Sequence, residues 1–176
     1  MDVEDDHPPE AGLGLEEARQ PTLTDLVSLC RELNAREALY IVIDGFAIRA
    51  AGYERTTMDV DLLIATDLEN EARVVAALAT LPDQAILEME PGEVETYTVV
   101  RVGDEIVVDL MKSACGIDYS EASREIDYHE INGVCIPFAS PRLLWRMKVK
   151  THREKDAADL FFLRRLLAAR GIPLPE

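Results

Sequence analysis

Residues 43–64, IDGFAIRAAGYERTTMDVDLLI, decide the fold of this chain. The stretch begins with a glycine turn and a short helix-like segment, and it ends in an apolar, strand-like run that holds Asp59 and Asp61. In a strand, residues i and i+2 point to the same face, so both carboxylates converge on one spot. Two carboxylates aimed at one point repel each other unless a cation lies between them. The stretch therefore predicts a divalent metal, and the glycine turn beside it indicates phosphate chemistry.

A third acid strengthens this prediction. Residues 105–111, EIVVDLM, form another strand candidate, with Asp109 in its apolar centre. A bare carboxylate in such a strand would be costly to bury without a partner. If the two strands are neighbours, the three aspartates form a cluster of oxygen ligands, which suits Mg²⁺. The alternative is that Asp109 pairs with a nearby arginine.

In its order of motifs, the chain resembles the polymerase-β-like nucleotidyltransferase superfamily, and most closely its small prokaryotic branch of AbiEii-like and minimal nucleotidyltransferases. The matching positions, in sequence order, are the strand 41–43, Gly45, Ala47, Gly52, Arg55, Thr57, Asp59 and Asp61. Asp109 stands at the place of the family's third carboxylate, and residues 148–160 resemble its C-terminal helical signature. The resemblance covers roughly residues 25–168 and is more specific for the fold than for activity.

The resemblance implies an α/β (α+β) fold, with a mixed sheet flanked by helices and a C-terminal helical tail. It also implies metal-dependent transfer of a nucleoside monophosphate from a nucleoside triphosphate to an acceptor hydroxyl. The expected cofactor is Mg²⁺ or Mn²⁺, and the acceptor is a protein, a tRNA or a small molecule. AbiEii-like relatives are linked to toxin–antitoxin and defence systems, so a partner protein is plausible. The residues implied as catalytic and metal-binding are Asp59, Asp61 and Asp109, and those implied as nucleotide-binding are Gly45, Arg55, Thr57 and Lys148.

One residue departs from the family pattern. Asp44 stands where the first small residue of the phosphate turn is expected, and a carboxylate there repels phosphate if it points inward. Three interpretations stay open: Asp44 points away, the metal arrangement is unusual, or the site is degenerate. The alternative function is thus a catalytically degenerate binding or regulatory module on the same scaffold. A second rival is a metal-dependent phosphate-ester hydrolase.

Each nucleotide-binding candidate also has a purely structural interpretation. Gly45 serves equally as a turn glycine, and Arg55 and Thr57 serve equally as surface residues before a strand. The functional alternative for Thr57 is that it bonds a phosphate or orients Asp59. Lys148 fits a solvated helix face. Asp156 and Asp159 lie three apart on one predicted helical face, where they can pair with a basic residue; the candidates are Arg153, Lys155 and Arg55.

Charge and composition narrow the class of protein. The 176-residue chain has a formal net charge of −16, which argues against a general DNA-coating protein. Nine of its 18 Lys and Arg residues lie in 142–170, either as a solvated face or as a basic arm for phosphate. The acidic start lacks the pattern of a signal peptide, and no apolar run is long enough to span a bilayer. With three widely spaced cysteines expected as free thiols, a cytoplasmic protein without a membrane role is predicted.

The chain is expected to divide into an acidic, disordered tail (1–20), a nucleotidyltransferase core (21–139) and a helical segment packed on the core (140–176). One helix is predicted to begin after Thr24 as N-cap, and another to begin at Pro141. Further helices are predicted over 45–51, 70–81 and 154–170. The inner face of the helix over 70–81 is predicted to consist of Ala72, Val75, Ala76 and Ala79. Strands are predicted at 39–43, 58–64, 85–89, 95–102, 105–111, 126–131 and 134–137. Turns at 103–104 and 132–133 predict two hairpins.

Overall fold

The structure is a computed structural model that describes residues 18–176. Most of the predicted disordered tail therefore lies outside the described residues. The α-helices are α1 (Leu23–Ala35), α2 (Gly45–Ala50), α3 (Leu68–Leu78), α4 (Glu93–Tyr97), α5 (Tyr119–Ala122), α6 (Pro141–Lys148) and α7 (Ala157–Ala169), with 3-10 turns η1 (Ala85–Glu88) and η2 (Glu154–Asp156). None of the helices among these residues has the length and apolar character needed to cross a membrane.

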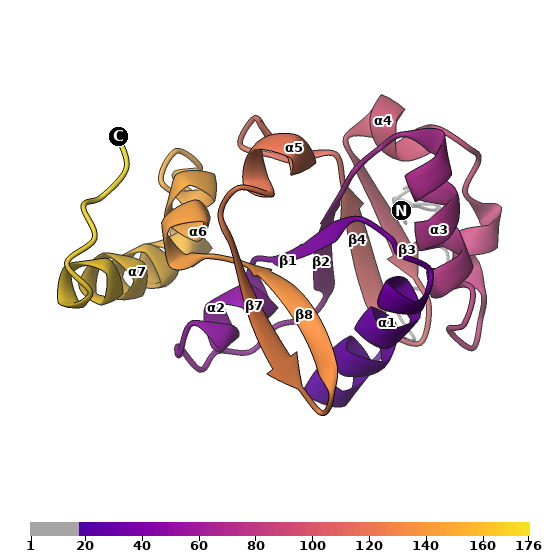
Figure 1. Ribbon diagram of the computed structural model, residues 1–176, viewed down its shortest axis with the longest axis horizontal. Coiled ribbons are helices and arrows are strands. Elements are labelled where there is room, and N and C mark those ends of the chain that lie inside the picture. Colours follow the sequence, from indigo (N-terminus) through magenta and orange to yellow (C-terminus); the bar gives the residue numbers. More distant parts are fainter. Residues whose placement is uncertain (1–17) are drawn as a thin grey trace, which may run out of the picture.

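A six-stranded mixed sheet in the order β3-β4-β2-β1-β8-β7 forms the centre of the molecule (Figure 1). Its strands are β1 (Tyr40–Ile43), β2 (Val60–Ile64), β3 (Val99–Gly103), β4 (Val107–Met111), β7 (Ile126–Ile131) and β8 (Val134–Ala139), and β5 (Ser113–Ala114) pairs with β6 (Ile117–Asp118) in a small second sheet. The pairs β2–β4 and β1–β8 are parallel, and the remaining neighbours in the large sheet are antiparallel. The predicted α/β class, with a mixed sheet, flanking helices and a C-terminal helix, is confirmed.

The two faces of the sheet have different roles. Tyr40 on β1 donates a hydrogen bond to Asn34 of α1, and α1 packs beside α3, so these two helices cover that face. Because side chains alternate along a strand, Ile43, Asp61 and Asp109 point to the opposite face. Helix α6 contacts α2, β8 and α7, and Figure 1 shows α6 and α7 at the opposite end of the molecule from α1 and α3.

The first helix begins two residues earlier than predicted. Its N-cap is Thr22, not Thr24: the Thr22 hydroxyl accepts from the Asp25 backbone N–H, and the Asp25 carboxylate accepts from the Thr22 backbone N–H. This reciprocal arrangement satisfies two backbone donors at once and therefore outweighs a single-sided cap. Arg19, which precedes α1, also pairs with Asp25 and with Glu105, so it ties this helix to the connection just before β4.

The predicted inner face of α3 is wrong by about one residue. Its buried side chains are Asn70, Glu71, Val74, Ala77 and Leu78, while Ala72 and Ala76 are exposed. Asn70 bonds the backbone of both strand ends beside it, at Leu39 and Ala65, and Glu71 accepts from the Gly92 N–H. Because of these tertiary hydrogen bonds, the buried face of α3 includes two polar residues. The periodicity of apolar residues, on which the prediction is based, does not reveal them.

The prediction of strands at 85–89 and 95–102 is wrong in part. The first is the 3-10 turn η1, because Asp104 accepts from the backbone N–H groups of Asp83 and Ala85 and holds that segment curled. The second is split: α4 follows Gly92, whose φ of +88° suits a glycine, and only β3 is extended.

The other predicted elements are confirmed within a few residues. Both hairpins form, and Asn132 and Gly133 have the positive φ angles that a tight hairpin turn needs. Helix α6 has Ser140 as N-cap and Pro141 at its first position. The three cysteines are free: Cys30 is buried, and Cys115 and Cys135 are exposed.

Candidate metal centre and the adjoining pocket

Three carboxylates predicted from the sequence come together in the fold. Asp61 on β2 and Asp109 on β4 occupy paired positions of two parallel strands. Asp59 lies just before β2, and one carboxylate oxygen from each of the three lies within 4.8 Å of the others. Asp61 and Asp109 are buried, and Asp59 is partly exposed. We refer to this group as the aspartate triad.

The aspartate triad has a single basic partner among the described residues. Arg101 on β3 donates from Nε to Oδ1 of Asp109 at 2.9 Å and from Nη2 to its Oδ2 at 2.8 Å. The same Nη2 lies 3.1 Å from Oδ2 of Asp59. The pairing of Asp109 with an arginine, which the sequence left open, is therefore present. The third carboxyl group, that of Asp61, is 5% exposed; it shares a hydrogen bond with Asp59 and has no ion pair with Arg101.

Asp59 and Asp61 hold protons more tightly than isolated carboxylates. Burial, followed by the neighbouring Asp59 charge, raises the pKa of Asp61 to about 9. Burial and the Asp109 charge also raise the pKa of Asp59. In contrast, the hydrogen bonds to Asp109 raise the pKa of the Arg101 guanidinium, which stays positive. Three carboxyl groups with one guanidinium partner form an oxygen-rich set that suits a divalent cation.

A second acidic group lies beside the triad but is already neutralised. It comprises Asp44, Asp156 and Asp159, and the ammonium Nζ of Lys148 lies 2.7, 3.0 and 3.2 Å from their carboxylate oxygens. Arg55 adds ion pairs to Asp44 at 2.9 Å and to Asp159 at 3.2 Å. We call this group the lysine cluster. Because Lys148 contacts all three carboxylates, the cluster has its cation built in.

The contacts within the lysine cluster favour the charged forms of Lys148 and Asp156. Burial alone would raise the pKa of Asp156, but hydrogen bonds from Thr151, Lys148 and Arg153 outweigh it and lower the pKa to about 2. Burial would likewise lower the pKa of Lys148, but the carboxylates of Asp44, Asp156 and Asp159 together outweigh burial and raise it. Asp159 is held differently, because neither of its ion pairs has the geometry of a hydrogen bond.

Two predicted nucleotide-binding residues pack against each other. A Cβ added to Gly45 would overlap Oγ1 of Thr57 and lie 2.6 Å from its Cβ, so only glycine fits there. The Thr57 hydroxyl donates to the backbone carbonyl of Asp59 at 3.0 Å. This hydrogen bond to the Asp59 backbone supports the interpretation that Thr57 orients Asp59.

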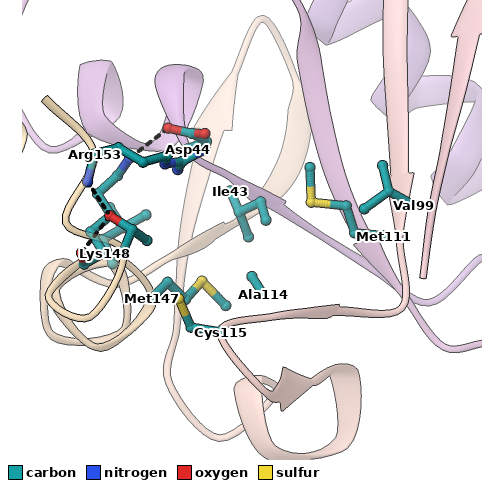
Figure 2. A pocket seen from close by; sticks show the side chains of 11 residues that line it. Ile43, Asp44, Val99, Met111, Ala114, Cys115, Met147, Lys148 and Arg153 are labelled. Atoms are coloured by element: carbon teal, nitrogen blue, oxygen red, sulfur yellow. Dashed lines mark hydrogen bonds and ion pairs between the residues drawn. The ribbon is translucent and has the colours of Figure 1, made fainter. Parts of the chain in front are cut away.

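A pocket of about 370 Å³ opens between the sheet and α6. Figure 2 shows Asp44, Lys148 and Arg153 at one side of it and apolar side chains, among them Ile43 and Met111, at the other. Met111 follows Asp109 by two residues on β4, and Ile43 pairs with Asp61, so the pocket floor continues the sheet face that carries the triad. The pocket, triad and lysine cluster therefore form one continuous region.

Sequence reasoning missed Arg101 as a member of this region. The β3–β4 connection spans residues 104–106, and this length places Arg101 directly opposite Asp109. A two-residue turn at 103–104, as predicted, gives a different register. A basic residue opposite an acid in a hairpin was the available signal, and it depended on the length of the turn.

No protein-family model and no curated protein matches the chain. Among solved structures, it is similar to the crystal structure of an antigenic nucleotidyltransferase-like protein from Paracoccidioides brasiliensis. The two chains are 18% identical, the match covers 82% of this chain and 74% of that chain, and the TM-score is 0.49. A likeness of this degree does not assign the chain to a family or to an activity, and the AbiEii-like branch stays a prediction.

Proposed function

We propose that this chain is a metal-dependent nucleotidyltransferase that moves a nucleoside monophosphate from a nucleoside triphosphate to an acceptor hydroxyl. The observation that carries the proposal is the aspartate triad with its single guanidinium partner. Its buried Asp61 has no basic partner in the described part of the chain, and the triad borders a pocket large enough for a small ligand. The lysine cluster, which has equally many carboxylates, lacks this excess charge because Lys148 contacts all of them.

The donor set fits the expected cofactor. Asp59, Asp61 and Asp109 would hold Mg²⁺ or Mn²⁺, and the bound ion would offset the negative charge that develops at the reacting phosphate. In the proposed reaction, Asp109 accepts the proton of the acceptor hydroxyl. The hydroxyl oxygen forms a bond to the α-phosphorus, and the bond from that phosphorus to pyrophosphate breaks. Because Arg101 donates to both Asp109 oxygens, Asp109 takes this role only after Arg101 has moved.

The pocket supports a position for the nucleotide. Its apolar floor suits a base or sugar, and Lys148 on its wall suits phosphate. In this proposal, a triphosphate competes with Asp44 for the ammonium of Lys148, whose side chain is 4% exposed. Arg55 adds positive charge through its ion pair with Asp44. Gly45 packs against Thr57, and the Thr57 hydroxyl holds the backbone of Asp59.

A specific observation favours the second candidate, a non-catalytic module on this scaffold. Asp44 is engaged by both Lys148 and Arg55, so the cations predicted for phosphate are neutralised by a residue where a small one was expected. In that case the pocket would bind no triphosphate, and the triad would retain Arg101 as its counter-ion.

Calorimetric titration of the folded protein with ATP, GTP, CTP and UTP, first with Mg²⁺ and then with EDTA, separates the two candidates. The transferase proposal expects Mg²⁺-dependent binding of at least one nucleotide and its loss in Asp61→Asn. No binding by any of the four would overturn it in favour of the module. The finer part of the proposal is that the acceptor is a protein, a tRNA or a small molecule, and that the chain has an AbiEii-like role in a toxin–antitoxin or defence system. Transfer of label from the α-phosphate to each class of acceptor tests which acceptor is used.

A further inference from the structure

We propose that Arg101 is a built-in counter-ion that occupies the cation position of the aspartate triad and has to leave before a metal binds. This inference rests on the proposed metal centre and adds a residue that sets its metal affinity. Arg101 differs from the three aspartates in origin, because it comes from β3, the edge strand of the sheet.

The contacts place the guanidinium between the acids. Its Nη2 lies 2.8 Å from Asp109 and 3.1 Å from Asp59, so a single nitrogen touches two of the three carboxylates. A cation coordinated by the same oxygens would have to occupy the region that this nitrogen fills. The charges repel as well, because a divalent cation and a guanidinium at this separation oppose each other.

Exposure indicates that the arginine can leave. The Arg101 side chain is 52% exposed, whereas that of Asp109 is 6% exposed. Lys148, which plays the equivalent part in the lysine cluster, is only 4% exposed and contacts every carboxylate of its cluster. Arg101 therefore regains hydration when it swings outward, while Lys148 is a permanent member of its cluster.

The third acid supports the same conclusion. Arg101 holds Asp59 and Asp109, but it has no hydrogen bond or ion pair to Asp61. A guanidinium is therefore an incomplete partner for the triad. A metal that engages all three carboxylates also offsets the repulsion between Asp61 and its acidic neighbours, which gives it the advantage needed to displace the arginine.

The test is a titration with Mn²⁺ alone, followed by the paramagnetic signal of free Mn²⁺, for the wild-type chain and for Arg101→Gln. We expect Arg101→Gln to bind Mn²⁺ about tenfold more tightly or better. Arg101→Lys, which keeps a charge but loses the paired donors that hold both oxygens of Asp109, should fall between the two. Arg73→Gln, which removes an arginine paired with Glu69 on α3, is the control for the change in net charge and should bind as the wild type does.

Melting in EDTA and in Mn²⁺ gives a second readout. Arg101→Gln should melt below the wild type in EDTA, because its carboxylates have lost their counter-ion, and Mn²⁺ should remove most of the difference. If Arg101→Gln does not fold in EDTA, Arg101→Lys carries the comparison. A third result is that the wild type binds Mn²⁺ and Arg101→Gln binds it no more tightly. This result overturns the role of Arg101 but is compatible with the metal centre.

The remaining outcomes separate the two proposals. Mn²⁺ binding by Arg101→Gln but not by the wild type supports displacement as the barrier and contradicts a working metal centre in the native chain. Binding by neither overturns both proposals. Binding that survives Asp61→Asn shows that the ion sits elsewhere, and it also overturns both.

Discussion

The ammonium of Lys148 lies 2.7 Å from the carboxylate of Asp44, a residue 104 positions earlier in the chain. The contact joins the last turn of α6 to the turn after β1. It also couples the predicted phosphate-binding lysine to the residue that departs from the family pattern. The state of this pair therefore bears on both stability and nucleotide binding.

Replacing Lys148 by Met should destabilise the protein strongly. The change leaves three carboxylates facing one another with Arg55 and Arg153 as the remaining partners. Breaking a buried ion pair in this way typically costs about 3 kcal/mol or more. Urea unfolding measures the loss, and Lys150→Met, at an exposed position two residues later, is the matched control. A Lys148→Met variant as stable as this control would contradict the described cluster.

Replacing Asp44 by Gly should change stability little while improving the affinity for nucleotide. Asp44 has φ 57° and ψ −133°, a conformation that suits glycine and costs another residue on the order of 1–3 kcal/mol. Relief of this strain offsets the lost ion pairs, so we expect a net change within about 1 kcal/mol. Removing the carboxylate also frees Lys148 for phosphate, which should lower the Kd for a Mg²⁺–nucleotide complex. An unchanged or higher Kd would argue against Lys148 as a phosphate ligand.

Replacing Gly45 by Ala should destabilise through a steric clash with Thr57. The added methyl would lie 2.6 Å from the Thr57 Cβ, and overpacking of this kind costs about 1–3 kcal/mol. The double variant Gly45→Ala with Thr57→Gly removes the clash, so the two effects should be less than additive in a double-mutant cycle. Additive losses would mean that glycine is needed at this position for another reason.

The stability of the metal-free protein should fall as pH rises, and Asp61 should account for much of the fall. The pKa of Asp61 is raised from 3.8 to about 9 in the folded state, so the folded protein binds this proton more tightly than the unfolded chain. The resulting stability is fully present below the unfolded pKa and is lost as pH rises toward the folded value.

In EDTA, Asp61→Asn should therefore be more stable than the wild type near pH 8, and its free energy of unfolding should fall less between about pH 5 and 8. Urea unfolding across that range measures the difference. Asp127→Asn, on β7, serves as the control for a general change in charge. A wild type and an Asp61→Asn variant with parallel pH profiles would contradict the raised pKa.

The aspartate triad was largely predictable from the sequence. Alternation along a strand places Asp59 and Asp61 toward one side, and an apolar strand around Asp109 needs a partner for its carboxylate. The parallel pairing of β2 with β4 was a condition of the prediction, and the structure supplies it. Local patterns therefore identified the acids, while tertiary pairing brought them together.

The errors occurred where tertiary contacts override local preference. Asn70 and Glu71 are buried because they bond loop backbone far along the chain, and Asp104 curls residues that otherwise have strand character. Arg101 joined the site because the β3–β4 turn is one residue longer than predicted, which changes the partner of every residue in β3. Such contacts depend on register and loop length, which hydrophobic periodicity does not determine.

The most direct test of the account follows the α-phosphate. Wild type and Asp61→Asn are each incubated with the four α-labelled nucleoside triphosphates, Mg²⁺, and fractions of total protein, total RNA and small molecules; labelled acceptor and released pyrophosphate are then measured. The account predicts that the wild type alone transfers label to one fraction and releases pyrophosphate in equal amount. Equal transfer by Asp61→Asn, or release of inorganic phosphate with no labelled acceptor, would contradict it.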